Sequence, residues 1–379
     1  MRHPIAPVLF GLLPLLSACS APDHGTQQVS ARPESKLLPS DPPATTGSWL
    51  LDQRKLKAGQ LTDDLPLGDY ATHPKAQQFI EYMVAKHQYD RAQLTYWLNH
   101  AQRLDSVLRL MDQQAPSSAS SLPSGPNGAW LRYRQKFITP GNVQNGVDFW
   151  REHGDALRRA QQQYGVAPEI IVGIIGVETR WGRVMGNTRL LDALATLAFD
   201  YPRRETFFTG ELENFLLMAR EDGVDAHELR GSFAGAMGYC QFMPSSFKAY
   251  AVDFNGDGKT DLWDPEDAIG SVANYFQAHG WSQNDTIAVK ARGQARDLEP
   301  GLKQHYPVAT LQAAGLRPMA RVPHSEALLL RLDVGKQYEY WYGLPNFTTI
   351  TLYNHSVYYA MAVWQLGEAV KQQLGYTAG

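Results

Sequence analysis

The sequence predicts a mainly helical α+β fold, in which a large helical body is followed by a small β subdomain and closing helices. Apolar residues recur every three to four positions in several segments between residues 73 and 279, as expected for amphipathic helices. From residue 287 to 351 the pattern changes to short alternating stretches rich in β-branched and aromatic side chains, which predicts strands. Helical periodicity then returns over 357–374.

The N-terminus has the pattern of an export signal. The apolar run 5–16 is too short to span a bilayer and matches the core of a signal peptide. Small residues stand directly before Cys19, as in a bacterial lipobox, so we expect residues 1–18 to be a lipoprotein signal peptide and Cys19 to carry lipid. An ordinary signal peptide cut near Ala18 is the alternative. Ser20 favours delivery to the outer membrane of a Gram-negative bacterium, facing the periplasm.

Residues 19–48 are rich in Ser, Pro, Thr and Gln, a composition that predicts a flexible tether rather than a core. The formal net charge of −3 and the lack of a basic run argue against nucleic-acid binding. The chain has two cysteines, and lipid on Cys19 would leave Cys240 without a disulfide partner. We interpret Cys240 as a small packing residue.

The folded part divides, on these patterns, into a helical region over 49–283, a β subdomain over 284–347 and C-terminal helices over 348–379. A Ser/Pro/Gly stretch from 115 to 128 marks a connection within the first region. The helices expected after residue 128 are 147–164, 168–182, 190–197, 204–219, 246–252, 265–279 and 357–374. The strands expected are 327–332, 338–342 and 348–352.

Glu178 is a carboxylate within an unusually apolar helical segment that begins at Pro168 and ends at Gly182. Four apolar residues fall on the same helical side as Glu178: Ile171, Ile174, Ile175 and Trp181. Loss of solvation on that side disfavours the charged form and raises the pKa, which suits a proton donor near neutral pH. The alternative is a buried structural Glu paired with Arg180 or Arg183.

A segment rich in small residues follows downstream: Gly231-Ser-Phe-Ala-Gly-Ala-Met-Gly-Tyr-Cys-Gln-Phe-Met-Pro-Ser-Ser246. A Glu-bearing helix followed by this segment resembles the lytic murein transglycosylases, above all the membrane-bound B type. The resemblance extends from about Trp130 to the C-terminus, with its clearest motifs between Glu169 and Trp281. It implies a lysozyme-like helical catalytic core.

The resemblance also implies the chemistry. In that family one Glu protonates the β-1,4 glycosidic oxygen between N-acetylmuramate and N-acetylglucosamine of peptidoglycan. It then takes a proton from the muramate 6-hydroxyl, leaving a 1,6-anhydro ring during cell-wall turnover. Glu178 matches this residue. Most glycosidases use two carboxylates, and Asp192 and Asp200 are nominees for a second one, but we favour capping and solvated surface roles for both.

Nine further positions match the family's substrate contacts, although core packing is the default for any tyrosine taken alone. The residues expected to contact the sugar at the cleavage point or to frame the catalytic Glu are Ser232, Gln241, Tyr275, Tyr353 and Asn354. The residues expected along the glycan groove, or at peptide and lactyl carboxylates, are Tyr133, Tyr359, Arg203 and Arg204.

A second motif runs from residue 253 to 264 and has EF-hand-like spacing, with Gly at loop position 6. The expected ligands are Asp253, Asn255, Asp257, Lys259 through its main-chain carbonyl, Asp261 and Asp264. We expect a structural Ca²⁺, with Na⁺ as a substitute ion, and modest affinity because the twelfth position is Asp where Glu is usual. A turn-rich loop without metal is the alternative. No organic cofactor is expected.

Two other functions compete with the transglycosylase interpretation. The first is a muramidase that hydrolyses the same bond, and the second is a non-catalytic peptidoglycan-binding lipoprotein. The partners expected are peptidoglycan glycan strands, the membrane through the N-terminal lipid, and enzymes of cell-wall synthesis. We expect a monomer.

Overall fold

The computed structural model describes residues 66–114, 125–295 and 297–377, so the predicted signal peptide, lipidated Cys19 and tether lie outside the described part. Its α-helices are α2 (Pro74–His87), α3 (Arg91–Asn99), α4 (Asp105–Gln114), α5 (Ala129–Arg134), α6 (Pro140–Glu152), α7 (Gly154–Tyr164), α8 (Pro168–Thr179), α9 (Leu190–Asp200), α10 (Glu205–Asp222), α11 (Pro244–Tyr250), α12 (Pro265–Ala278), α13 (Val308–Ala313), α14 (Pro345–Tyr353) and α15 (Val357–Thr377). A 3₁₀ turn, η1 (Pro202–Arg204), precedes α10. The mainly helical prediction is confirmed.

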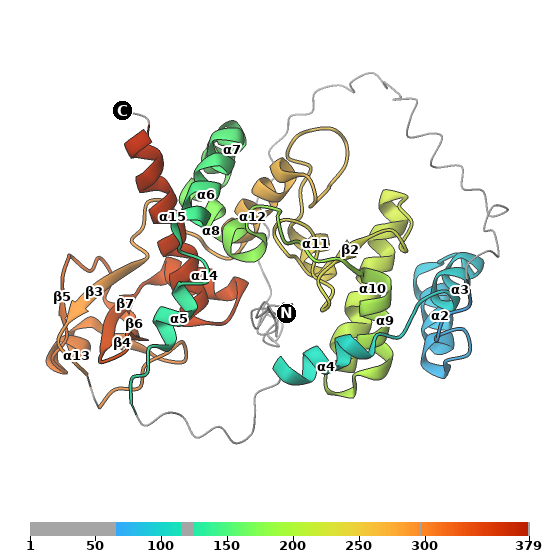
Figure 1. Ribbon diagram of the computed structural model, residues 1–379, viewed down its shortest axis with the longest axis horizontal. Coiled ribbons are helices and arrows are strands. Elements are labelled where there is room, and N and C mark those ends of the chain that lie inside the picture. The colour runs from blue at the N-terminus through green and yellow to red at the C-terminus, as the bar shows by residue number, and fades with distance from the viewer. Residues whose placement is uncertain (1–65, 115–124, 296, 378–379) are drawn as a thin grey trace, which may run out of the picture.

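Helix α8 lies at the centre of the molecule, between the sheet on one side and α9 and α10 on the other (Figure 1). It packs against α15, α6, α7 and α12, which explains why its sequence is apolar almost all round. The approach to α15 is close. A Cβ atom on Gly173 would stand 2.3 Å from the carbonyl oxygen of Val363, so a glycine is required there.

The β subdomain is an antiparallel sheet in the order β4-β6-β7-β3-β5. Its strands are β3 (Ala288–Arg292), β4 (His305–Pro307), β5 (Arg317–Pro318), β6 (Glu326–Asp333) and β7 (Tyr338–Gly343). Alternate residues of β6 point to opposite faces. Leu328 and Leu330 join the main core, whereas Leu329 joins a smaller core within the subdomain. The sheet is therefore attached to the helical body by one face. A further pair, β1 (Thr188–Arg189) and β2 (Arg230–Gly231), lies near α9.

Two local predictions were wrong. The β-branched stretch 348–352 lies within helix α14, which begins at Pro345 and buries Phe347 and Ile350 at helical spacing. Packing against α15 thus outweighs the β-propensity of this stretch. The single helix expected over 147–164 is two helices that meet at His153.

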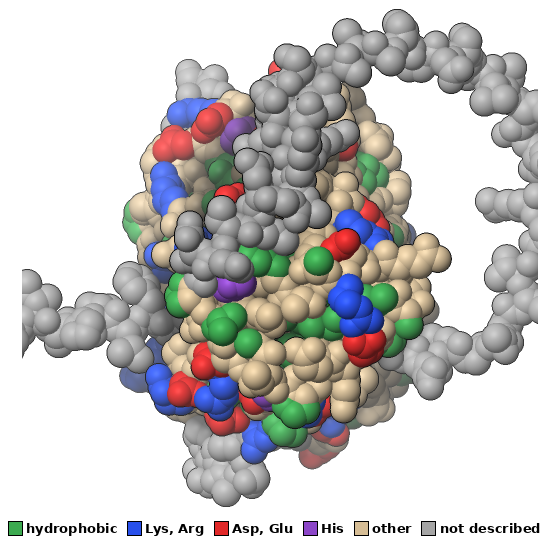
Figure 2. Space-filling model, turned by 90° about the vertical axis from the view of Figure 1, so that its right-hand side faces the viewer, with side chains coloured by type: hydrophobic (Ala, Val, Ile, Leu, Met, Phe, Trp, Pro, Cys, Tyr) green, Lys and Arg blue, Asp and Glu red, His purple; other side chains and the backbone are tan. Residues whose placement is uncertain are grey.

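The face of the molecule on the side of α2 and α3 carries Lys and Arg side chains next to Asp and Glu (Figure 2). Ion pairs of these helices include Lys75 with Glu205 and Arg91 with Glu81. None of the helices in the described ranges is long and apolar enough to cross a membrane.

Candidate active site

Glu178 is the penultimate residue of α8, where the helix ends against the glycine-rich segment 231–246. The hydroxyl of Thr179 donates to the carbonyl of Tyr239 over 2.9 Å and accepts from the amide of Gly182, which ties the two segments together. Arg180, Trp181 and, in the glycine-rich segment, Gln241 all have positive φ angles, between 51° and 56°. Such backbone is costly for residues other than glycine and is held here by its surroundings.

The carboxyl of Glu178 accepts a hydrogen bond of 2.5 Å from the hydroxyl of Tyr359, a residue of α15. Burial raises the pKa of Glu178 to about 7, and the Tyr359 hydrogen bond acts against this rise because it stabilises the carboxylate. Burial and the Tyr359 hydrogen bond account for the pKa shift of Glu178 within the described ranges, and no arginine charge contributes to it.

Three more groups lie close enough to Glu178 for its charge to change their pKa values. Burial raises the pKa values of Tyr133, Tyr353 and Cys240, and the Glu178 charge adds to each rise. The hydroxyl of Tyr353 donates to the carbonyl of Cys240 over 2.5 Å, and its ring lies parallel to that of Tyr359 with centroids 6.4 Å apart. Cys240 is fully buried and unbridged, as expected of a packing residue.

Tyr275, a residue of α12, packs against Tyr353. Its ring lies edge-on to Tyr353 at 4.9 Å, and its hydroxyl donates to the carbonyl of Leu352 over 2.8 Å. Asn354 is buried at the end of α14. The structure thus brings Tyr133, Tyr353 and Tyr359 around Glu178, with Tyr275 behind them.

Ser232 and Gln241 of the glycine-rich segment are hydrogen-bonded to backbone groups. The Ser232 hydroxyl accepts from the amides of Ala234 and Ala236. The side-chain amide of Gln241 donates to the carbonyls of Gly238 and Met185, over 2.9 and 3.2 Å. Both residues therefore shape the loop, and the recorded contacts do not place either against Glu178 within the described ranges.

The two arginines expected at substrate carboxylates lie in η1, on the α10 side of the molecule. Arg203 is exposed, whereas the guanidinium of Arg204 covers the ring of Phe207 at 4.1 Å. The Arg204 charge also lowers the pKa of Glu211, although burial is the larger effect and raises it.

Asp192 and Asp200, the two candidates for a second catalytic carboxylate, make their contacts with other parts of the fold. Asp192 is buried and pairs with Arg189 over 2.7 Å, and it also accepts from the amide of Gln102. Asp200 accepts from the hydroxyl of Tyr70 over 2.8 Å. Both carboxylates are thus engaged in contacts within the fold. The expectation that Asp192 is solvated was wrong, because it is buried and joins α9 to the chain before α4. No carboxylate of the described residues is among the groups that shift the Glu178 pKa.

The predicted metal loop, residues 253–264, connects α11 to α12. Gly258, at loop position 6, has φ of +86° and makes the expected sharp turn. Carboxylate oxygens of Asp253, Asp257 and Asp261 accept hydrogen bonds from amides of the loop itself. Asp264 caps α12 by accepting from the amides of residues 266 and 267.

The donor chemistry of this loop fits a hard cation, since all its side-chain ligands except that of Asn255 are carboxylates and the turn is correct. However, no group of three or more His, Cys, Asp or Glu side chains within the described ranges is arranged to hold a metal ion. The geometry shows a loop closed by its own amides, and the metal stays a prediction.

Sequence reasoning missed Asp267, which holds this loop to α12. Its buried carboxylate accepts from the amides of Phe254 and Asn255 with one oxygen and from the amide of Asp261 with the other. A carboxylate in the first turn of a helix is common as a dipole partner, so nothing in the local pattern distinguishes Asp267 as a residue that holds the loop.

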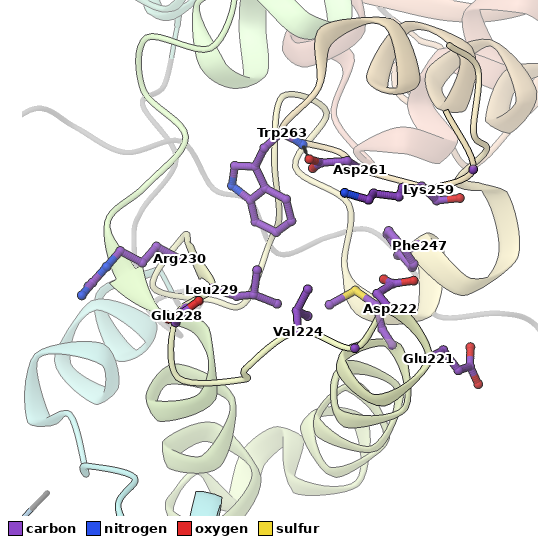
Figure 3. Close-up of a pocket in the computed structure, with 14 residues that line it drawn as sticks. Glu221, Asp222, Val224, Glu228, Leu229, Arg230, Phe247, Lys259, Asp261 and Trp263 are labelled. Carbon is purple, nitrogen blue, oxygen red and sulfur yellow. Dashed lines mark hydrogen bonds between the residues drawn. The ribbon is translucent and has the colours of Figure 1, made fainter. Parts of the chain in front are cut away.

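A cavity of about 540 Å³ lies where the loop meets the end of α10 (Figure 3). Trp263 faces Leu229 and Val224 across it, and Lys259 and Asp261 contribute from the loop. Burial, together with the charges of neighbouring carboxylates, raises the pKa of Asp222 in its wall to about 6. This cavity was also not predicted.

Comparisons with known proteins agree with this arrangement. The sequence matches the transglycosylase SLT domain family over residues 71–368. It is 60% identical over 369 residues to the membrane-bound lytic murein transglycosylase B of Escherichia coli K12, with 96% of each chain covered. The E. coli lytic transglycosylase SLT35 in complex with calcium has a TM-score of 0.78 and 65% identity, covering 82% of this chain and 97% of that chain.

A more distant relative has the same architecture. SltB3 from Pseudomonas aeruginosa, in complex with NAG-anhNAM-pentapeptide, has a TM-score of 0.67 and 30% identity, covering 78% of each chain. The family match over most of the chain and the identity to transglycosylase B lead to one conclusion: this chain belongs to the family of transglycosylases with an SLT domain.

Proposed function

We propose that the chain is a lytic transglycosylase that cleaves the β-1,4 bond between N-acetylmuramate and N-acetylglucosamine in peptidoglycan and leaves 1,6-anhydro-N-acetylmuramate ends. The observation that carries the proposal is Glu178, a carboxyl with a pKa of about 7 that is hydrogen-bonded to Tyr359 and has no carboxylate among its recorded partners in the described ranges. The names of the relatives, lytic murein transglycosylases, support the same activity and substrate.

The proposed reaction needs one group that first donates a proton and then accepts one. Protonated Glu178 donates its proton to the glycosidic oxygen, and the bond from the muramate C1 to that oxygen breaks. The substrate's acetamido oxygen stabilises the positive charge at C1. The resulting Glu178 carboxylate then accepts the proton of the muramate 6-hydroxyl, whose oxygen bonds to C1 and closes the anhydro ring. The carboxyl is thereby restored and no water is consumed.

The surrounding tyrosines have separate roles in this proposal. Tyr359 orients Glu178 and stabilises its carboxylate form through the 2.5 Å hydrogen bond. Tyr133, which is partly exposed, offers a ring face to sugar C–H groups. Tyr353, whose ring lies parallel to those of Tyr359 and Phe276, frames Glu178. We propose direct sugar contacts for Ser232, Gln241, Tyr275 and Asn354 as well, and contacts of Arg203 and Arg204 with peptide or lactyl carboxylates.

Product analysis tests the activity. Purified sacculi digested with the protein should release muropeptides whose muramate ends lack one water, because the 6-hydroxyl replaces water as the nucleophile. Mass spectrometry separates these products from the reducing ends that a muramidase would produce. Predominantly reducing ends would establish a hydrolase, and intact sacculi would indicate a binding protein.

We also propose that the 253–264 loop holds a structural Ca²⁺, with Na⁺ as a substitute, through the six ligands expected from the sequence. The oxygen donor set and the Gly258 turn support this, as does calcium in the E. coli SLT35 structure. The ligands would supply stability to the segment between α11 and α12, and no proton or electron of the reaction passes through them.

For its location we propose an outer-membrane lipoprotein facing the periplasm, anchored through Cys19 and separated from the membrane by residues 19–48. The membrane-bound E. coli relative supports this location. We propose peptidoglycan glycan strands as the substrate partner, and cell-wall synthesis enzymes as protein partners of a monomer.

A further inference from the structure

The β subdomain contains a cavity of about 350 Å³, which we call the β-subdomain cavity. Its lining residues are Pro126, Gln294, Arg331, Lys336, Gln337, Tyr338 and Tyr340. Two of these are cations and none is a carboxylate. The cavity beside α10 in Figure 3 differs in charge, since four carboxylates and two cations line it. The β-subdomain cavity is therefore the better match for an anionic ligand.

Its side chains are suited to a sugar that bears a carboxylate. The guanidinium of Arg331 lies over the Tyr338 ring at 4.6 Å, which limits its freedom before any ligand arrives. A guanidinium held in this way presents a fork that matches a carboxylate. Lys336 is exposed in the turn between β6 and β7, and the Tyr338 ring is partly exposed. Aromatic rings of this kind pack against sugar C–H faces.

The β6–β7 turn is joined directly to the helix that approaches Glu178. Asp333, at the end of β6, accepts hydrogen bonds from the amides of Asn127 and Gly128 over 2.8 and 2.7 Å. Those two residues precede α5, which packs against β6 (Figure 1). The position of α5 is thus fixed relative to the cavity.

Aromatic side chains continue from the cavity to Glu178. Burial raises the pKa of Tyr358, while the Asp333 backbone and the Arg331 charge lower it, which places Tyr358 beside the end of β6. Its ring is 5.7 Å from that of Tyr133, and Tyr133 is within the electrostatic reach of Glu178. Tyr133, Tyr358 and Tyr338 are all partly exposed.

We propose that the β-subdomain cavity binds a carboxylate-bearing unit of the same glycan strand that Glu178 cleaves, several sugars away from the cleaved bond, and so makes the enzyme prefer long acidic strands. This inference rests on the proposed function. Arg331 and Lys336 would recognise the carboxylate, and Tyr338 and Tyr358 would support the intervening sugars. The carboxylate belongs either to a stem peptide or to the muramate lactyl group.

Kinetics on soluble glycan strands test the proposal with the variants R331A, K336A and R331A/K336A. The matched control is R321A, an exposed arginine of the same subdomain outside the cavity. We expect the double variant to raise KM on peptide-bearing strands roughly tenfold, which is about 1.4 kcal/mol, with kcat and the melting temperature unchanged. R331K should recover part of the loss, which a purely structural role of the stacked side chain would not predict.

Strands stripped of peptides by an amidase identify the carboxylate. A KM difference found only on peptide-bearing strands assigns it to the stem peptide. A difference found only on stripped strands assigns it to the lactyl group, whose carboxyl is bonded to the peptide until stripping frees it. Wild-type KM for the double variant on both substrates would overturn the proposal. Strand affinity measured by co-sedimentation in an E178Q background separates this result from failure of the proposed reaction, because binding is then read without turnover.

Discussion

Replacing Glu178 with glutamine should abolish turnover and, at neutral pH, make the protein more stable. The amide matches the carboxyl in shape and can still accept the Tyr359 hydrogen bond, but its N–H groups are not acidic enough to transfer a proton to the glycosidic oxygen. Loss of general acid and base assistance typically costs at least about 10² to 10⁴ in rate. The gain in stability follows from the buried position of the carboxyl, because glutamine carries no charge to desolvate.

The size of this gain follows from the pKa. Burial moves the pKa of Glu178 from 4.5 to about 7, and one pKa unit corresponds to about 1.36 kcal/mol. Between these pH values the folded chain keeps the proton that the unfolded chain releases, so folding stability falls as pH rises through this window. Above pH 7 the full penalty applies, at most about 3 kcal/mol. We expect E178Q to exceed wild type by about 1 to 3 kcal/mol near pH 8 and to match it near pH 4.

Urea denaturation at several pH values, together with sacculus digestion, measures both effects. The matched control is E169Q, which alters a carboxylate at the other end of α8 that pairs with Lys371 over 2.7 Å. It should keep turnover and lose at most about 1 kcal/mol. If E178Q digests sacculi within a few-fold of wild type, or shows no pH-dependent gain in stability, the assignment of Glu178 as a buried acid is refuted.

Three further outcomes are expected. Tyr359→Phe removes a hydrogen bond that favours the carboxylate, so the decline of kcat above about pH 7 should move upward by about one unit; an unchanged pH–rate profile would contradict this. Added calcium should raise the melting temperature of protein freed of metal, because binding adds up to about 2.7 kcal/mol to the free energy of unfolding at a hundredfold excess over Kd. Asp253→Ala should remove that response. Melting curves that are identical with and without calcium would show that the loop binds no metal. Cys19→Ala should release the protein from the membrane fraction, and fractionation that finds the variant still membrane-bound would count against the lipid anchor.

Local patterns in the sequence were sufficient for the helical character of the chain and for the position of Glu178 near the end of an apolar helix. They failed at residues 348–352, because β-branched side chains also occur in helices when a neighbouring helix buries them, as α15 does here. They also failed at His153, where α6 ends and α7 begins at Gly154, because a single glycine within an otherwise helical pattern does not by itself predict a helix end.

The site itself depends on contacts between distant parts of the chain. Tyr359 is 181 residues from Glu178, and no periodicity connects the two. Only the family resemblance placed Tyr359 near the site. The same is true of Asp192, which is tied to Gln102 across 90 residues and was wrongly expected to be solvated. Burial of a charged residue is decided by such partners, so sequence spacing alone does not predict it.

A single carboxyl that serves as acid and then as base requires a pKa near the working pH. With a pKa of 4.5, about 0.3% of Glu178 would be protonated at pH 7, whereas a pKa of about 7 protonates about half, a gain of roughly 150-fold in the acid form. The Tyr359 hydrogen bond limits the rise and so preserves the carboxylate for the second step. Tyr133, Tyr353 and Cys240 all have raised pKa values, so they stay neutral at this pH. Of the five groups in this cluster, Glu178 is therefore the one that exchanges its proton near neutrality, as a mechanism with one catalytic carboxyl demands.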